Sequence, residues 1–161
     1  MAQLRLREGT EHDAVAISTL INAAFRPERF FTDRDRTNPG EVRTLLKQGT
    51  FLLGEDQGVL VVCVYLERRG DRVYLGLLSV DPTRQRSGFG TWMMQAAEDY
   101  CRSSGARAID LKLVNLRREL PAYYRQRGYV ETGILPWPPQ ISTNQPCHFI
   151  CMAKELSSPE E

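Results

Sequence analysis

The sequence lacks an excess of charge, a long apolar run and a leading apolar segment. Its 161 residues carry a net charge of only +1, so no strong basic field draws the chain to nucleic acid. The longest uninterrupted apolar run, residues 59–66, is far shorter than the ~20 residues that a membrane-spanning helix needs. The first ten residues contain no signal-peptide core. We therefore expect a cytoplasmic protein that binds neither nucleic acid nor a membrane.

Cysteine is also scarce, because the chain has four, too few and too scattered for a disulfide framework. The segment CHFIC at residues 147–151 combines two of them with a histidine. On a strand, Cys147 and Cys151 would face one side about 13 Å apart and His148 would face the other. One metal ion could not bind all three side chains. We expect no metal site and reduced, mostly buried thiols.

The residues that are present indicate one ordinary globular domain. The composition is 42% hydrophobic and 25% charged. The length suits a single domain over residues 1–156 with a frayed tail at 157–161. Apolar residues at period two predict strands, and those at helical spacing predict helices. The expected order is β-α-α-β-β-β-α-β-α-β-β, with strands at 3–7, 51–54, 59–68, 73–80, 108–114, 129–134 and 147–153, and helices that start near Thr10, Glu41, Thr91 and Pro121.

The third of these helices is the clearest element, since it carries a continuous apolar stripe and ends before Gly105 in the manner of a C-terminal glycine cap. The stripe comprises Trp92, Met93, Ala96, Ala97, Tyr100 and Cys101.

The segment SVDPTRQRSGFG, residues 79–90, joins a predicted strand to this helix and is the most informative part of the chain. A glycine-containing turn at this place collects free backbone N–H groups at a helix N-terminus, and those donors favour a phosphate. Gly88 and Gly90 leave no side chain in its way. The polar or cationic side chains beside it are Gln85, Arg86, Ser87 and Thr91.

Two other phosphate-binding patterns fit this segment less well. A dinucleotide-binding G-x-G-x-x-G needs a third glycine, and Met93 stands in its place. The G-K-[ST] of a P-loop is absent. From the segment alone, a glycine-bearing helix start without a ligand stays open as well.

The turn resembles motif A of the GNAT superfamily of acetyl-CoA-dependent acetyltransferases, Q/R-x-x-G-x-G/A, which residues 85–90 match without a mismatch.

A second block is similar: the family commonly has an asparagine after its fifth strand, then a helix with a tyrosine, then Gly-Phe or Gly-Tyr. Here Asn115, Tyr124 and Gly128-Tyr129 take these places, although the stretch from Asn115 to Tyr124 is longer than usual. The resemblance covers residues 73–134 well and the N-terminal third only in element order. It implies an α/β fold with a mixed, mostly antiparallel sheet that splays between the fourth and fifth strands.

The resemblance also implies a reaction, the transfer of an acetyl group from acetyl-CoA to a primary amine of a small molecule or protein. The backbone N–H of Val80 would meet the thioester carbonyl, and the backbone around Leu78 would pair with the pantetheine arm. Tyr124 would protonate the departing thiolate, which suits a tyrosine pKa of about 10. The implied acetyl-CoA-binding residues are Leu78, Val80, Gln85, Arg86, Ser87, Gly88, Phe89, Gly90, Thr91, Asn115 and Tyr124.

The general base and the acceptor stay open at this stage. Some family members have a glutamate in the fourth strand where this chain has Tyr74, so Glu67, His148 or a water chain could serve instead. The loops at 26–38 and 135–146 would shape the acceptor pocket. A non-catalytic acyl-CoA-binding sensor is the alternative function, and an interaction domain that binds no CoA is a third. The sequence leaves a homodimer open.

Overall fold

The computed structural model describes residues 3–32 and 34–157, which form one seven-stranded mixed sheet covered by four α-helices. The strand order is β1-β2-β3-β4-β5-β7-β6, and only β4 and β5 pair in parallel. The strands are β1 (Arg5–Glu8), β2 (Thr50–Asp56), β3 (Val59–Arg69), β4 (Arg72–Val80), β5 (Ala108–Val114), β6 (Val130–Pro136) and β7 (His148–Glu155). The α-helices are α1 (Ala14–Ala24), α2 (Pro39–Gln48), α3 (Phe89–Ser103) and α4 (Leu120–Gln126), and short 3-10 turns are η1 (Glu11–Asp13), η2 (Arg26–Phe30) and η3 (Pro82–Arg84).

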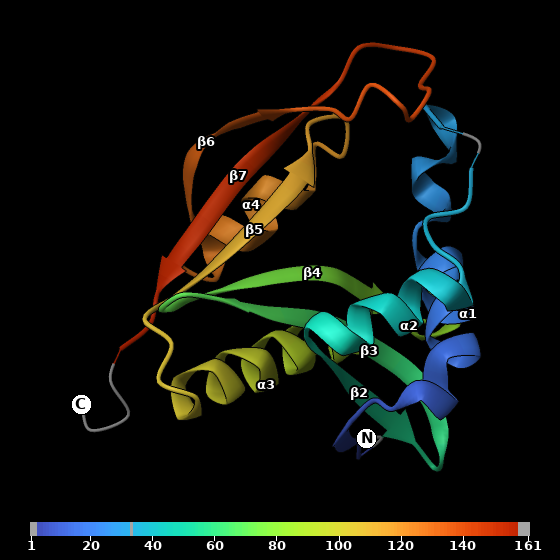
Figure 1. Ribbon diagram of the computed structural model, residues 1–161, viewed down its shortest axis with the longest axis vertical. Helices are drawn as coiled ribbons and strands as arrows, with labels where there is room; N and C mark the ends of the chain where they lie inside the picture. Colours follow the sequence, from blue (N-terminus) through green and yellow to red (C-terminus); the bar gives the residue numbers. More distant parts are fainter. Residues whose placement is uncertain (1–2, 33, 158–161) are drawn as a thin grey trace.

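The element order matches the predicted one. The predicted splay between β4 and β5 is also confirmed (Figure 1). Of the predicted tail at 157–161, residues 158–161 lie outside the described residues. Within the described ranges, none of the helices has the length and apolar composition needed to cross a membrane.

Helices α1 and α2 cover one face of the sheet, and α3 covers the other (Figure 1). Successive side chains of a strand point to opposite faces, and β2 illustrates the result. Its Leu53 packs with Ile17 of α1 and Val42 of α2, whereas its Leu52 packs with Met93 of α3. The sheet therefore buries apolar side chains on both faces, which explains the nearly continuous apolar sequence of its central strands.

Strands β5, β7 and β6 form a second wing of the sheet, which reaches back to the N-terminal half through one long connection. Residues 137–147 extend from β6 to η2 (Figure 1). There Asn144 donates two hydrogen bonds, from its backbone nitrogen to the Phe31 carbonyl at 2.9 Å and from its side chain to the Phe30 carbonyl at 2.7 Å. The ring of Trp137 lies 6.0 Å from that of Phe31. This proline-rich loop is thus fastened to the opposite side of the molecule.

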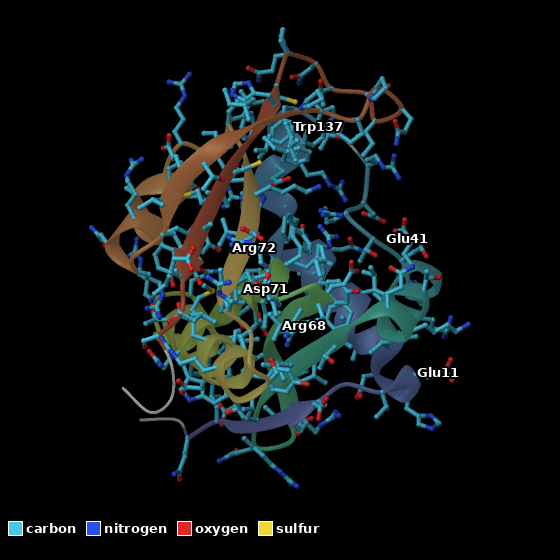
Figure 2. The ribbon with its side chains drawn as sticks, turned by 60° about the vertical axis from the view of Figure 1, so that its left-hand side comes forward. Glu11, Glu41, Arg68, Asp71, Arg72 and Trp137 are labelled. Carbon is cyan, nitrogen blue, oxygen red and sulfur yellow. The ribbon has the colours of Figure 1, made fainter. Side chains whose placement is uncertain are left out.

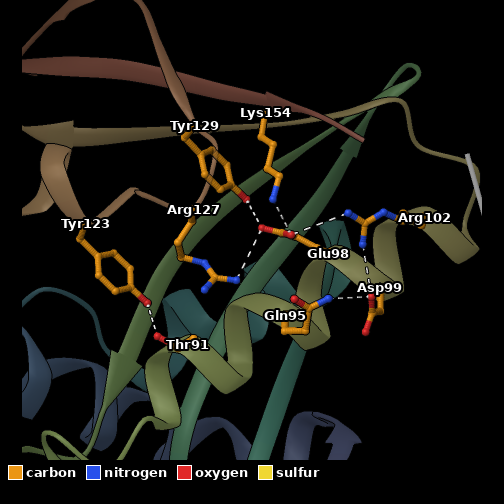
Figure 3. A network of polar contacts seen from close by, with 9 residues as sticks. All are labelled: Thr91, Gln95, Glu98, Asp99, Arg102, Tyr123, Arg127, Tyr129 and Lys154. Atoms are coloured by element: carbon orange, nitrogen blue, oxygen red, sulfur yellow. Dashed lines mark hydrogen bonds and ion pairs between the residues drawn. The ribbon is translucent and has the colours of Figure 1, made fainter. Parts of the chain in front are cut away.

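The buried face of α3 is rotated from the predicted apolar stripe. Tyr100, which we expected in the stripe, is 36% exposed, whereas Glu98 is 1% exposed. The Glu98 carboxylate accepts hydrogen bonds from Tyr129 Oη at 3.1 Å and Lys154 Nζ at 2.9 Å, with Arg127 4.0 Å away (Figure 3). A buried carboxylate is tolerated here because the second wing supplies its counter-charges. A pattern that counts apolar residues alone could not have placed Glu98 inside.

Candidate active site

A cavity of about 620 Å³ lies where β4 and β5 separate. The two strands pair only from Arg72–Ala108 to Tyr74–Asp110, so beyond Tyr74 their facing edges have no partner strand. The walls are these two edges, the start of α3, α4, η2 and the first part of the 137–147 connection. Unpaired strand edges can hydrogen-bond an extended ligand in place of a strand.

The edge of β4 presents backbone groups of Leu78 and Val80 to this cavity. The strand has a bulge near Leu77, whose φ of 58° lies in the left-handed region. After the bulge, the N–H of Asp81 donates to the Val61 carbonyl of β3 at 2.8 Å. Because N–H directions alternate along a strand, the N–H groups of Val80 and Leu78 point away from β3. Both residues line the cavity, so their predicted contacts are available to a ligand.

The turn between β4 and α3 exposes several N–H groups at the start of the helix. Helix α3 begins at Phe89 with Gly88 as its N-cap, and its first helical hydrogen bond runs from Trp92 N to the Gly88 carbonyl at 2.9 Å. The N–H groups before Trp92 therefore have no helical partner. Arg86 and Gly88 both have positive φ, 66° and 82°, which folds the turn toward the cavity. All seven residues from 85 to 91, which the sequence predicts to contact acetyl-CoA, line it.

The side chains of the turn divide into those with partners in the protein and those without. Gln85 Nε2 donates to the Val80 carbonyl at 3.4 Å, and the Ser87 hydroxyl donates to the Arg84 carbonyl. The Thr91 hydroxyl lies 3.1 Å from that of Tyr123, which ties the start of α3 to α4 (Figure 3). The backbone and Arg86 are thus the groups of the turn best placed to bind an anion.

Tyr124 lies against the cavity from the side of α4. It is 6% exposed, and its ring meets those of Tyr123 and Tyr129 edge-on at 5.1 Å and 5.7 Å. Burial, and next the neighbouring Tyr123, raise the pKa of the Tyr124 hydroxyl well above its usual value. Among residues 3–32 and 34–157 no hydrogen bond to this hydroxyl is found, and it is not one of the fully buried side-chain atoms that lack a partner, so it keeps some exposure where Tyr124 lines the cavity. A protonated, unpartnered hydroxyl is suited to donating a proton.

Three residues considered from the sequence lie away from the cavity. Asn115 closes the β5–β7 ladder, since its side-chain oxygen accepts from His148 N at 2.8 Å and its own N–H donates to the His148 carbonyl. Asn115 and His148 are both absent from the cavity walls. Glu67 accepts from Tyr65 Oη at 2.8 Å and from Arg69, and it borders an adjoining hollow beside α2 that shares Arg36 and Tyr74 with the cavity. The pairing with His148 holds the Asn115 side chain away from the cavity, so its predicted contact with acetyl-CoA stays a prediction.

A carboxylate that the sequence analysis did not single out lines the cavity instead. Glu28 of η2 is 13% exposed and lies 3.3 Å from Arg117, which follows β5. Burial raises the pKa of Glu28, while the positive charge of Arg117 opposes the shift. No motif marks an acidic residue in a loop, and only the folding of η2 over the splay brings it to this place.

The cavity suits a phosphorylated thioester such as acetyl-CoA. Its walls offer unpaired strand edges for an extended arm, a helix N-terminus for phosphates and a buried hydroxyl donor. No group of three or more potential metal ligands occurs in the described part of the chain. Cys63 and Cys101 are buried, and Cys147 and Cys151 are partly buried.

The fold is that of an α/β protein whose sheet splays around a cleft suited to a phosphorylated ligand. The chain belongs to the acetyltransferase (GNAT) family, whose model matches residues 15–129. Acetyl-CoA-dependent acetylation is the activity of that family, so the resemblance in the turn and the element order is confirmed. No curated protein sequence matches the chain.

Several solved structures share the fold. Ard1 from Thermoplasma volcanium superposes with a TM-score of 0.81 at 17% identity, over 96% of this chain and 99% of that one. The ribosomal-protein-S18-alanine N-acetyltransferase from Escherichia coli gives 0.76 at 16% identity, over 96% and 95%. The yncA acetyltransferase from Salmonella typhimurium, solved with its cofactor acetyl-CoA, gives 0.73 at 17% identity, over 96% and 94%. At such identities the likeness shows the fold alone.

Proposed function

We propose that this protein transfers an acetyl group from acetyl-CoA to a primary amine by direct attack, with Tyr124 as general acid. The observation that carries the proposal is the convergence on one cavity of the free N–H groups of the 85–91 turn, the unpaired β4 edge and the buried Tyr124 hydroxyl. Bound acetyl-CoA supplies the acetyl group as an activated thioester. The acceptor is an amine of a small molecule or of a protein.

The chain's own groups have distinct tasks in this proposal. The N–H of Val80 donates to the oxygen on which negative charge develops, and a fixed donor of this kind is a large contribution to catalysis. Tyr124 gives its hydroxyl proton to the departing sulfur. Leu78 holds the extended arm of the ligand through its backbone. These roles are supported by the position of Val80 and of the turn, both of which line the cavity.

We assign the general base to Glu28. An amine must lose a proton to attack, and the base must be a carboxylate or neutral imidazole that can reach the cavity. Glu67 and His148 do not line it. Of the described carboxylates that do, Asp35 and Glu41 are exposed, and Asp35 is paired with Arg29. Glu28 is largely buried, and its burial raises its pKa. A raised pKa makes a carboxylate a stronger proton acceptor at neutral pH.

Acetyl-CoA is expected to stabilise the folded protein. A ligand at 100 times its Kd adds about 2.7 kcal/mol, which for a chain of this length raises the Tm by roughly 5–10 °C. S-acetylpantetheine, which lacks the phosphates, should raise it much less because it cannot use the 85–91 turn. Thermal denaturation with each ligand measures this difference. An unchanged Tm with saturating acetyl-CoA would reject both the transferase and the sensor.

Release of CoA separates the transferase from a non-catalytic sensor. With a panel of primary amines, we expect thiol release that depends on the amine. Tight acetyl-CoA binding without release for any amine would favour the sensor.

Replacing Glu28 with Gln is expected to lower kcat/KM by roughly 10²-fold, the usual contribution of a general base. Because the pKa of Glu28 is raised, the wild-type rate should fall as pH drops through a value above the usual ~4.3 of glutamate. This fall in rate at low pH, the acid limb of the pH–rate profile, should disappear in Glu28→Gln. The pH profile is measured with two amines of different pKa, since a limb that moves with the amine belongs to the amine.

Glu119→Gln is the matched control, because Glu119 contacts the same Arg117 at 3.0 Å but is 63% exposed and does not line the cavity. It should retain nearly the full rate. An equal loss of kcat/KM in both variants would mean that the effect acts through Arg117, which both glutamates contact, rather than through a general base.

A further inference from the structure

The side of the cavity nearest α1 and α2 carries positive charge that the transfer chemistry does not use. Lys112 of β5 points to this face, because its neighbours Leu111 and Leu113 pack on the α3 side. Its ammonium group lies 4.5 Å from the ring centre of Phe149 and 5.9 Å from that of Tyr74. Lys112 lines the cavity, so this charge faces a bound substrate.

The charges nearest to Lys112 are also positive. Arg69 lies 4.5 Å over the ring of Tyr74, and Arg36 lines the same cavity. Partial burial, then Arg36 and Arg69, lower the pKa of Lys112, and no carboxylate contributes to the shift. Arg69 has a partner in Glu67 at 3.0 Å. Among the described residues, Lys112 and Arg36 form no ion pair.

The rest of this side of the cavity is apolar and held in place. The rings of Trp137 and Phe149 lie 5.0 Å apart, tilted by 32°, and both line the cavity. Trp137 Nε1 donates to the Ile141 carbonyl at 3.0 Å, and Figure 2 shows Trp137 beside η2, beneath the 137–147 connection. The carboxylates that line the cavity in the described part of the chain are those of Glu28, Asp35 and Glu41. Glu28 is paired with Arg117 and Asp35 with Arg29, so positive charge lies beside both.

We propose that the acceptor is a small amino carboxylate with an apolar or aromatic body, whose carboxylate binds to Lys112 and Arg36. The proposal rests on the proposed transferase function and specifies its substrate class. The amine lies toward Glu28, and the apolar body lies against Trp137 and Phe149. Lys112 and Arg36 form no ion pair among the described residues, and the carboxylate on which the charge of Arg36 acts is that of Glu28. Such cations can bind an incoming anion, since a charge-assisted hydrogen bond to it is stronger than a neutral one.

The first test is equilibrium binding of the reaction products. N-acetylated apolar and aromatic amino acids, from N-acetylleucine to N-acetyltryptophan, are titrated into wild-type protein saturated with CoA. The acetamide of each corresponding decarboxylated amine is titrated in parallel. We expect at least one acid to bind about 10-fold or more tightly than its uncharged counterpart. If acetyl-CoA binds but no acid is preferred, the amino carboxylate is rejected while the transferase stands. If acetyl-CoA itself does not bind, the proposed function fails.

Three variants assign any preference to the cavity. Lys112→Met keeps the length of the side chain and should abolish the preference while leaving affinity for the uncharged acetamides unchanged. Lys112→Arg should restore most of it. Lys47→Met is the matched control, because it removes the same charge from an exposed position of α2 outside the cavity, and it should keep the preference. A preference that persists in Lys112→Met overturns the assignment, and so does an equal loss in Lys47→Met.

Discussion

Replacing Tyr124 with Phe should lower kcat by roughly 10²-fold while leaving the affinity for acetyl-CoA nearly unchanged. The substitution removes one hydroxyl and keeps the ring that packs against Tyr123 and Tyr129, so the fold should persist. Because burial raises the pKa of this hydroxyl, wild-type activity should show no alkaline fall from Tyr124 below pH about 10. Single-turnover transfer to an established acceptor at several pH values measures the effect on the chemical step.

Tyr129→Phe is the matched control for this experiment. Tyr129 is equally buried and its ring adjoins that of Tyr124, but its hydroxyl donates to Glu98 rather than facing the cavity. Its loss should reduce stability by about 1–2 kcal/mol and leave kcat within a few-fold of wild type. Unchanged turnover in a folded Tyr124→Phe protein would remove this residue from the mechanism and leave solvent or Tyr123 as the proton source.

Replacing Gly88 with Val should weaken acetyl-CoA binding by at least about 100-fold, which corresponds to about 2.7 kcal/mol. A side chain at this position would meet no protein atom within 4 Å, so it would project into the space that the turn leaves for a phosphate. The φ of 82° adds strain for any residue but glycine. Calorimetric titration with acetyl-CoA measures the affinity, and circular dichroism confirms that the protein is folded.

Gly105→Val separates the two effects. Gly105 follows α3 with the same φ of 82° and equally empty surroundings, yet it does not line the cavity. Gly105→Val should lower the free energy of unfolding by an amount similar to that of Gly88→Val, while its affinity for acetyl-CoA stays that of the wild type. Wild-type affinity in Gly88→Val would show that the phosphate site lies elsewhere.

The helices and strands could be predicted from local sequence patterns, and so could the turn at residues 85–91. Gly88 and Gly90 lie where an apolar strand gives way to a helix, and each of the seven residues from 85 to 91 borders the cavity; that they bind acetyl-CoA stays a prediction. Such a site depends on backbone N–H groups that a few consecutive residues arrange. Its chemistry could therefore be inferred without knowledge of the tertiary structure.

The sequence predicted that the loops at 26–38 and 135–146 shape the acceptor side, but it could not say which of their residues line the cavity, because these residues meet only through contacts distant in sequence. Glu28 comes from η2, Lys112 from β5 and Trp137 from the connection after β6. No periodicity or spacing links these three positions. For Asn115 the sequence pattern is present but the expected geometry is not. Its place in the chain order matches the family pattern, but its side-chain oxygen accepts a hydrogen bond from His148 N at the end of the β5–β7 ladder.

The Glu98 cluster constrains how this sequence can vary. One carboxylate on α3 neutralises cations from the second wing, Lys154 and Arg127. Exchanging Glu98 alone leaves those cations without a counter-charge, and exchanging Lys154 alone weakens the compensation of a buried carboxylate. Apolar replacements of Glu98, Lys154 and Arg127 made together avoid both penalties, because matched apolar residues can substitute for a buried ionic group at little cost. These three positions should therefore change together, and homologues that lack the acid should also lack both of its cations.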